Sequence, residues 1–478
     1  MQYDQPYSAS DLKGSLANNP TLLSSTTAAA ISTLLALDTA ETVSVAEWDG
    51  VSAPVSPEGT TAALVTATIE GAAGDNVALA IPAELSAAEA FIFDSEANLV
   101  VSFDTPAPVG TFAALAVEGE VAATAATDSI PELIVTSGAG DDTLIFTGDQ
   151  NVYVDGRDGD DVIITAAGND TIYGGAGNNV IISGAGDDQI FLAGTSDVVD
   201  AGEGYDVVTL EGSRDGYTFV AGNNFNVDGT GSQTASITNA EFLAFDNEES
   251  IALATSEDQA AALRLYQGIL GRDADAAGAK VWAGAADQGV ATGSIAQSFL
   301  DSFEFKADAS EAFVTSLYEN LLERTAPEAT DVEYWSNVLA SGASRADVAT
   351  TFALSPDAIT VDQTNSEYVE SLYQSALGRE SDAEGLNSWV TALFNGASRG
   401  DIAQSIVNSA EAATKVNADF IDTLYSNALD RPADTEGKAF WVDSLAQGVT
   451  QAEVAVAIVG SPEAVDNIDN VIVIHGQV

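Results

Sequence analysis

The sequence predicts a multi-domain fold class: an N-terminal mainly-β domain, a parallel β-roll and a C-terminal all-α repeat array. The first part contains short apolar runs separated by turn-forming residues, which is typical of strands. The middle has a glycine- and aspartate-rich repeat of nine residues, and the second half has a helical repeat of 52 to 55 residues. With 478 residues, 46% of them hydrophobic, the chain can form several domains with cores of their own.

The first two segments carry no recognisable chemistry. Residues 1–40 are expected to form an N-terminal helical segment, with Leu34 to Leu37 as its apolar edge. Residues 41–130 are expected to form a small β-domain, because Leu64 to Ile69 and Leu99 to Phe103 are apolar runs bounded by Gly, Pro, Asp and Asn.

Residues 131–211 repeat the template G-G-x-G-x-D-x-U-x, in which U is apolar. The sixth place is filled by Asp142, Asn151, Asp161, Asp170, Asn179, Asp188, Asp197 and Asp206, at a spacing of nine residues except for ten between Asn151 and Asp161. Two residues further on stand Leu144, Tyr153, Ile163, Ile172, Ile181, Ile190, Val199 and Val208. Glycines allow tight turns, and the residues after each sixth place form a short strand whose middle side chain points inward. Two nonapeptides therefore complete one coil of a stacked roll.

Stacking places the sixth-place side chains in two columns. One column is expected to hold Asp142, Asp161, Asn179 and Asp197, and the other Asn151, Asp170, Asp188 and Asp206. Carboxylates one strand spacing apart repel one another unless a cation lies between them. Dense oxygen ligands of this kind suit calcium.

These residues resemble the calcium-binding nonapeptide repeats (repeats in toxin, hemolysin-type) of proteins that Gram-negative bacteria export by type I secretion. The resemblance implies that each turn binds calcium through the sixth-place aspartate and turn carbonyls, and that the roll folds only outside the cell. The implied metal ligands are Asp142, Asp161, Asp170, Asp188, Asp197 and Asp206, with weaker sites at Asn151 and Asn179. The second repeat, TGDQNVYV, also lacks the glycines, which makes a site there doubtful.

Residues 212–255 are expected to form a β capping segment over the end of the roll. Four helical repeats of about 52 residues follow at 256–466. Each contains a Leu-Tyr pair, an Arg and a Trp, which are Tyr266, Tyr318, Tyr373 and Tyr425, Arg272, Arg324, Arg379 and Arg431, and Trp282, Trp335, Trp389 and Trp441. The units resemble the LYxxxLGR/W helical repeat domain of undetermined function found in secreted and surface-layer bacterial proteins. The second unit has Glu323 in place of the Gly of this pattern, so we expect it to turn differently.

The repeated side chains of this array have structural interpretations. The Tyr and Trp residues are expected in the helical core, and each Arg is expected to pair with a carboxylate. The tail, residues 467–478, resembles the C-terminal signal of type I export and is also compatible with a last edge strand.

Charge and composition exclude several classes of function. Fourteen Lys and Arg against 73 Asp and Glu give a net charge of −59, which excludes nucleic acid as a partner. Cysteine is absent and His475 is the single histidine, which leaves no disulfide, zinc finger, thiol nucleophile or internal Ser-His-Asp triad. The best apolar segment near the N-terminus, Ala28 to Leu37, is too short to span a membrane.

Two motifs imitate functional sites. Gly396-Ala-Ser398-Arg-Gly400 matches a nucleophile elbow, but Ser398 with Asp401 also reads as a helix capping box that recurs in the other units. The aspartates at 273, 275, 382 and 434 faintly resemble a calcium loop, but the twelfth-place Glu is missing and we interpret them as helix N-caps.

The sequence thus predicts a non-enzymatic, secreted calcium-binding structural protein, with calcium as its cofactor and no catalytic residue. It is expected to self-associate outside a Gram-negative cell, as a surface-layer or extracellular-matrix subunit in a calcium-bridged lattice or polymer. Expected partners are the type I export machinery and a cell-surface glycan or lipopolysaccharide anchor, with no nucleic acid and no membrane span. Two alternatives stay open: a calcium-dependent adhesin or glycan-binding surface protein that uses the N-terminal β-domain, and, less favoured, a secreted carboxylate-based hydrolase or lyase.

Overall fold

The computed structural model describes residues 7–20, 22–52, 54, 61–103, 131–222, 226–231 and 233–475. Residues 104–130 of the predicted β-domain and 476–478 of the tail lie outside the described residues. The chain divides into two compact units. The roll unit comprises Met1–Ala260, Ala274–Ala283 and Asn470–Val478, and the helical unit comprises Ala261–Asp273 and Gly284–Asp469.

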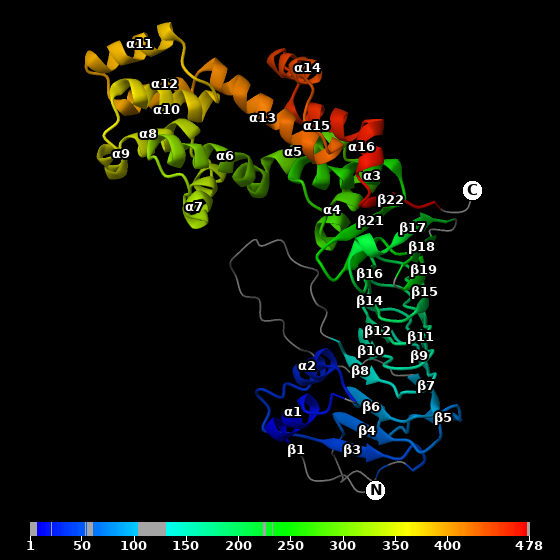
Figure 1. Ribbon diagram of the computed structural model, residues 1–478. Helices are drawn as coiled ribbons and strands as arrows, with labels where there is room; N and C mark the ends of the chain where they lie inside the picture. The colour runs from blue at the N-terminus through cyan, green and yellow to red at the C-terminus, as the bar shows by residue number, and fades with distance from the viewer. Residues whose placement is uncertain are drawn as a thin grey trace. The chain divides into compact units, whose positions relative to one another are not determined.

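The roll unit is built from two long sheets, and from Leu64 to Leu210 successive strands alternate between them (Figure 1). The 11-stranded sheet has the order β22-β21-β20-β16-β14-β12-β10-β8-β6-β4-β3, and the 9-stranded sheet has the order β17-β18-β19-β15-β13-β11-β9-β7-β5. Strands before the nonapeptides are β3 (Val45–Trp48), β4 (Leu64–Thr68), β5 (Asn76–Ala80), β6 (Ala90–Asp94) and β7 (Asn98–Phe103). Those of the repeats are β8 (Leu133–Thr136), β9 (Thr143–Phe146), β10 (Val152–Asp155), β11 (Val162–Ile164), β12 (Thr171–Gly175), β13 (Val180–Ile182), β14 (Gln189–Leu192), β15 (Ser196–Asp200) and β16 (Val207–Leu210).

All neighbouring strands from β3 to β16 pair in parallel, and their inward side chains form one core. The middle residues of the nonapeptide strands, such as Ile163, Ile172 and Ile181, are fully buried in it. The roll expected from the nine-residue period is therefore present.

The two sheets show no break at residue 131, where the sequence analysis placed a domain limit. Strand β7 pairs with β9, with Val101 opposite Leu144, and β6 pairs with β8, with Phe91 opposite Val135. Strands of the predicted β-domain thus share both sheets and the core with the repeats. Their coils have apolar side chains at the inward places without the glycine-aspartate turns, which is why the repeat pattern did not include them.

Two helices, α1 (Ala9–Ala17) and α2 (Ser25–Leu34), pack on the outer face of the larger sheet. Leu12 and Ile31 are buried there in one cluster with Leu64 and Ile92. Two short strands, β1 (Tyr7–Ser8) and β2 (Thr42–Val43), pair antiparallel. The helices thus cover strands that precede most of the nonapeptide coils.

Further strands continue the sheets beyond the last nonapeptide: β17 (Thr218–Ala221), β18 (Asn226–Thr230), β19 (Thr234–Thr238), β20 (Phe242–Phe245) and β21 (Ser250–Ala254). Strands β19 and β20 pair in parallel with β15 and β16, whereas β18 and β21 run antiparallel to β19 and β20. The tail forms β22 (Val471–Val473), which pairs in parallel with β21. It is therefore an edge strand, one of the two interpretations of its sequence.

The helical unit contains, in chain order, the end of α3 (Glu257–Leu265), the π-helical turn η2 (Tyr266–Leu270), part of α4 (Ala276–Asp287), α5 (Thr292–Asp301), α6 (Phe303–Leu321), α7 (Ala329–Ala340), α8 (Arg345–Ala353), α9 (Pro356–Thr360), α10 (Asn365–Leu377), α11 (Ala383–Phe394), α12 (Arg399–Val407), α13 (Ala410–Leu429), α14 (Thr435–Ala446), α15 (Gln451–Val459) and α16 (Pro462–Asn467). Helices α8 and α12 of the second and third repeats pack together, as do α5 and α15 of the first and fourth. None of the described helices is long and apolar enough to cross a membrane.

The repeated Arg and Tyr side chains confirm their structural interpretation. Each Arg pairs with a carboxylate 32 or 33 residues later: Arg272 with Glu304, Arg324 with Asp357, Arg379 with Glu411 and Arg431 with Glu463. Each also lies over the ring of the repeated Tyr, at 5.1 to 5.8 Å from its centre. The four Tyr are buried, but the four Trp are only half-buried, so the prediction of a core position was wrong in part for Trp.

Glu323 corrects another expectation. Its φ of 52° is left-handed, like the 69° of Gly271, the 67° of Gly378 and the 47° of Asp430 at the same place in the other units. The second unit therefore turns like its neighbours, and Glu323 adopts a conformation that glycine adopts more easily.

Candidate calcium-binding columns

The first column contains Asp142, Asp161, Asn179 and Asp197, as predicted. The backbone N–H of Asp142 donates to Asp161 Oδ1 at 2.7 Å, that of Asp161 to Asn179 Oδ1 at 3.0 Å, and that of Asn179 to Asp197 Oδ1 at 2.9 Å. Each sixth-place side chain thus contacts the backbone of the preceding coil. Parallel strand pairing with Ile163 opposite Ile181 keeps the four positions in line.

The second column contains Asp170, Asp188 and Asp206. Asp170 Oδ1 accepts from the N–H of Val152 at 2.9 Å, and the next two links, Asp170 to Asp188 and Asp188 to Asp206, are both 2.8 Å. Val152, not Asn151, therefore occupies the sixth place of the second repeat.

The alignment of that repeat was wrong by one residue. Tyr153 pairs with Thr171, so Val154 is the inward residue and Asn151 lies in the fifth place, where its Oδ1 accepts from the N–H of Asn169 at 2.6 Å. The ten-residue spacing belongs before this repeat rather than after it.

Five aspartates have one carboxylate oxygen that is buried and without a hydrogen-bond partner: Oδ2 of Asp161, Asp170, Asp188, Asp197 and Asp206. These side chains are at most 2% exposed. Burying a charged carboxylate oxygen without a partner is costly, and the group takes up a proton instead. Even a neutral polar group costs roughly 1–3 kcal/mol when it is buried without a hydrogen-bond partner. The five oxygens therefore mark places where a cation fits.

Asp142 and Asn179 differ from these five. Asp142 accepts from the N–H of Leu99 at 2.6 Å through Oδ1 and from that of Gly138 at 2.8 Å through Oδ2, so both its oxygens have partners. Asn179 Nδ2 donates to the carbonyl of Gly175 at 3.2 Å. The fit to a cation is thus best at the five other aspartates.

Burial raises the pKa of these carboxyl groups. The pKa of Asp161 and Asp206 rises to about 8 and that of Asp170 to about 7, with loss of hydration as the largest cause. The pKa of Asp142, Asp188 and Asp197 shifts in the same direction for the same cause. Charges of stacked neighbours add to the effect, for instance Asp188 on Asp206. Without a bound cation, the columns hold protons more readily than ordinary carboxylates do.

At particular places, the turns beside the columns have room only for glycine. A Cβ atom on Gly156 would lie 2.6 Å from the carbonyl oxygen of Gly174 and 2.8 Å from Asp161 Oδ2. Gly159, at a φ of 129°, would collide with the carbonyl oxygen of Gly140. Carbonyl and carboxylate oxygens therefore converge at the turns.

Within the part of the chain that the structure describes, no three or more His, Cys, Asp or Glu side chains form a metal-holding group. A calcium ion at these aspartates would take further ligands from carbonyls of the turns. Calcium takes six to eight oxygen ligands, including carbonyls, and this donor set fits it.

Glu241 lies outside the nonapeptide pattern and was not predicted as a site residue. The N–H of Asp206 donates to Glu241 Oε2 at 2.8 Å, which places this side chain one step beyond the repeats. The turn before it, SITNA, lacks the glycine template, and only the apolar run Phe242 to Phe245 at strand spacing could have indicated it.

The nucleophile-elbow motif at Ser398 and the loop motifs at Asp382 and Asp434 form helix caps. Ser398 accepts from the N–H of Asp401 and donates to its carboxylate at 2.7 Å in a full capping box, and Thr450 with Glu453 forms another. Asp382 and Asp434 are N-caps that accept from Gly385 and Gly437. The Ser398 hydroxyl is thus engaged in the cap of α12.

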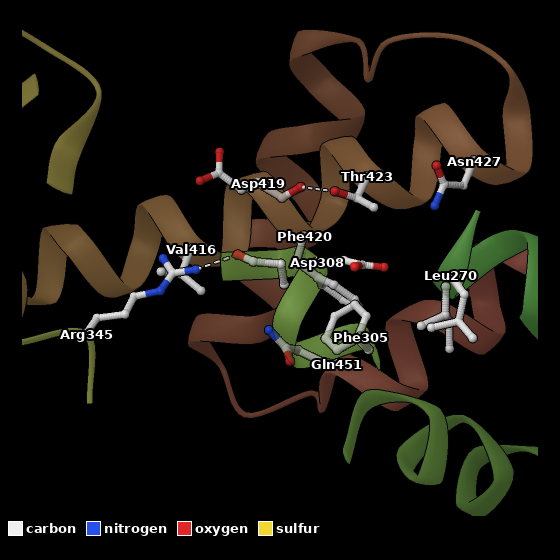
Figure 2. Close-up of a pocket in the computed structure, with 12 residues that line it drawn as sticks. Leu270, Phe305, Asp308, Arg345, Val416, Asp419, Phe420, Thr423, Asn427 and Gln451 are labelled. Carbon is white, nitrogen blue, oxygen red and sulfur yellow. Dashed lines mark hydrogen bonds between the residues drawn. The ribbon is translucent and has the colours of Figure 1, made fainter. Parts of the chain in front are cut away.

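The helical unit has a pocket of about 240 Å³ between α6, α13 and the start of α8 (Figure 2). Its apolar wall includes Phe305 and Phe420, and its polar groups include Asp308 and Arg345. Arg345 donates to the carbonyl of Ala309 at 2.7 Å. None of the predicted metal ligands lies in this pocket.

Comparisons with known families agree with the geometry. Residues 155–190 and 173–208 match the family described as RTX calcium-binding nonapeptide repeat (4 copies). Residues 254–309, 296–361, 358–416 and 403–468 match Domain of unknown function (DUF4214). No curated protein and no solved structure matches the chain. RTX repeats are typical of type I-secreted extracellular proteins. The chain therefore carries RTX nonapeptide repeats, which bind calcium, followed by four DUF4214 repeats.

Proposed function

We propose that this protein is a secreted structural protein that folds and assembles outside the cell when it binds calcium, as a surface-layer or extracellular-matrix subunit. The observation that carries the proposal is the set of five buried, unpartnered Oδ2 atoms in two columns. Asp161, Asp170, Asp188, Asp197 and Asp206 are the proposed ligands, with Asp142 and Asn179 as weaker members of the columns. Calcium, when bound, supplies the positive charge that these buried carboxylates lack.

The columns link folding to the calcium concentration. In the unfolded chain the aspartates are hydrated and far apart, whereas in the roll they are stacked and buried. A site at about 100 times its dissociation constant stabilises the fold by roughly 2.7 kcal/mol. Extracellular calcium modules bind at about 10⁻⁴ to 10⁻³ M. The roll is therefore less stable at the low calcium concentration inside the cell, which favours export, and calcium stabilises the folded roll outside it.

The net charge of the chain makes assembly dependent on cations. At a net charge of −59, copies of the chain repel one another. Calcium ions between acidic faces remove this repulsion and permit a lattice or polymer. We infer a non-catalytic role, because the only nucleophile motif, around Ser398, is a helix cap. A cell-surface glycan or lipopolysaccharide is the proposed anchor.

The test removes calcium from the full chain with a chelator. Circular dichroism follows folding, light scattering follows particle size, and electron microscopy shows whether a lattice, a filament or separate particles form on readdition. A lower thermal midpoint, partial loss of β-signal and disassembly are expected in chelator, with recovery in calcium but not in magnesium at the same concentration. A spectrum and particle size that do not respond to chelator would refute the proposal.

One observation favours the alternative, a glycan-binding surface protein. The rings of Tyr173 and Phe191 stack at 4.3 Å on the outer face of the larger sheet, beside a pocket of about 270 Å³ that Asp155 and Glu211 also line. Aromatic rings beside carboxylates suit the apolar faces and hydroxyl groups of sugars. Binding to a glycan array that Tyr173→Ala removes, with calcium-dependent folding intact, would support this function.

A further inference from the structure

The second column continues one step beyond the nonapeptides. Strand β20 pairs with β16 with Phe242 opposite Val207, so the preceding residue, Glu241, stands opposite Asp206. The N–H of Asp206 donates to Glu241 Oε2 at 2.8 Å, the same link at the same length that joins Asp188 to Asp206. Glu241 therefore takes the sixth place of a coil that has no nonapeptide sequence.

The other column does not continue. Strand β19 pairs with β15 with Ala235 opposite Asp197, so no carboxylate follows Asp197. Only the second column is therefore extended, by the residue before β20. Stacking further strands on the roll does not by itself add a carboxylate to a column.

An independent observation indicates a ligand at this step. Asp206 is 0% exposed and its Oδ2 has no partner. Its carboxylate lies close enough to Glu241, Asp188 and Asp187 for their charges to act on it. A buried carboxylate with an unpartnered oxygen, on which the charges of three other acidic side chains act, is unfavourable unless a cation is bound.

The cationic side chain beside Asp187 pairs outside the column. Lys280 forms an ion pair with Asp187 and lies 5.8 Å from the centre of the Tyr205 ring. Asp187 is a fifth-place residue, outside the column of sixth-place side chains, and among the described residues Lys280 forms no ion pair with Asp206 or Glu241. Lys280 therefore does not neutralise the sixth-place carboxylates.

We infer that Asp206 and Glu241, with carbonyls of the turn at residues 201–205, form a terminal calcium site that joins the capping strands to the last nonapeptide coil. This inference rests on the proposed function, because it assigns a further site for the same ion. Docking of β19 and β20 on the roll then depends on calcium, although neither strand belongs to a nonapeptide.

The test compares Glu241→Gln with Glu249→Gln in the full chain. Glu249 is a matched control because its Oε2 also accepts a backbone N–H, that of Arg214 at 2.9 Å, but lies outside the column. Glutamine keeps an acceptor oxygen in both variants and removes the charge. Equilibrium dialysis with elemental analysis counts bound calcium, and hydrogen exchange at residues 238–245 reports on docking of the cap.

Wild type and Glu249→Gln are expected to bind the same number of ions, and Glu241→Gln one fewer. In Glu241→Gln, calcium should no longer slow exchange at residues 238–245, while exchange at residues 162–182 should still slow. In chelator this variant should be no less stable than wild type, because it has lost a repulsive charge.

Three results would overturn the inference. An unchanged ion count with unchanged protection of the cap removes the terminal site and leaves the proposed function standing. Equal destabilisation of Glu241→Gln in chelator and in calcium shows that Glu241 only supports the strand. Absence of calcium uptake by wild type removes both the terminal site and the proposed function.

Discussion

Asn179 Nδ2 donates to the backbone carbonyl of Gly175 at 3.2 Å, whereas the aspartates before and after it in the column, Asp161 and Asp197, each have an unpartnered Oδ2. The side-chain amide of Asn179 thus contacts a turn carbonyl, as a bound cation would. Asn179 is a position where the column is stable without metal.

Replacing this amide with a carboxylate should make the coil more dependent on calcium. Asn179→Asp is expected to lower the thermal midpoint of the roll in chelator, because it adds a buried charge and removes the bond to Gly175. In millimolar calcium the same variant should be at least as stable as wild type and bind calcium more tightly. Calorimetry at both conditions measures this, and a variant that is destabilised equally in both would contradict it.

The stability of the calcium-free roll should fall as the pH rises from 4 to 8. The pKa is about 8 for Asp161 and Asp206 and about 7 for Asp170 in the folded chain, against about 3.9 in the unfolded chain. The folded state therefore binds more protons than the unfolded state in this window, and the free energy of unfolding decreases with pH. A higher thermal midpoint at pH 5 than at pH 8 is expected in calcium-free buffer.

A control for the pH dependence separates the columns from the net charge. Asp206→Asn should flatten the pH dependence, whereas Asp228→Asn, at an exposed position outside the columns, should leave it unchanged. A midpoint that rises from pH 5 to pH 8 without calcium would show that the buried carboxylates do not control stability.

Replacing Glu323 with Gly should stabilise the helical repeats. Glu323 has a φ of 52°, and a left-handed conformation costs a non-glycine residue about 1 kcal/mol. Denaturant unfolding in calcium is expected to show a gain of about that size. The matched variant Glu319→Gly, inside α6, should instead lose about 1 kcal/mol because glycine weakens a helix interior. Equal losses in both variants would rule out strain at Glu323.

Removing the Ser398 hydroxyl should affect stability and no chemistry. Ser398 caps α12, so Ser398→Ala is expected to lower the free energy of unfolding by about 1 kcal/mol. Ser344→Ala, at the cap of α8, should give a similar loss. Ester hydrolysis by wild type that disappears in Ser398→Ala but not in Ser344→Ala would instead indicate a nucleophile.

The nine-residue period was enough to predict the roll, its two columns and most of their members. The period fixes which side chains face inward and which lie at the turns, and the structure keeps this register from Asp161 to Asp206. The 52- to 55-residue repeat likewise indicated the helical array and the Arg–carboxylate pairs.

Three features were outside the reach of these patterns. The ten-residue spacing between two repeats allowed two positions for the extra residue. Only the pairing of Tyr153 with Thr171 shows that this residue comes before the second repeat. The coils formed by strands β3 to β7 have inward apolar side chains but no glycine-aspartate turns, so they carry no turn template. Glu241 reaches its column through strand pairing and not through the repeat.

The continuous sheets have a consequence for the kinetics of folding. Strands β3 to β7 carry none of the stacked aspartates, yet Phe103 of β7 stacks on Phe146 of β9 at 4.9 Å between ring centres. These metal-independent strands can serve as a preformed nucleus on which the nonapeptides add coil by coil, as in a zipper. Acquisition of structure after a calcium jump would then start at one fixed end of the solenoid and proceed without a lag phase.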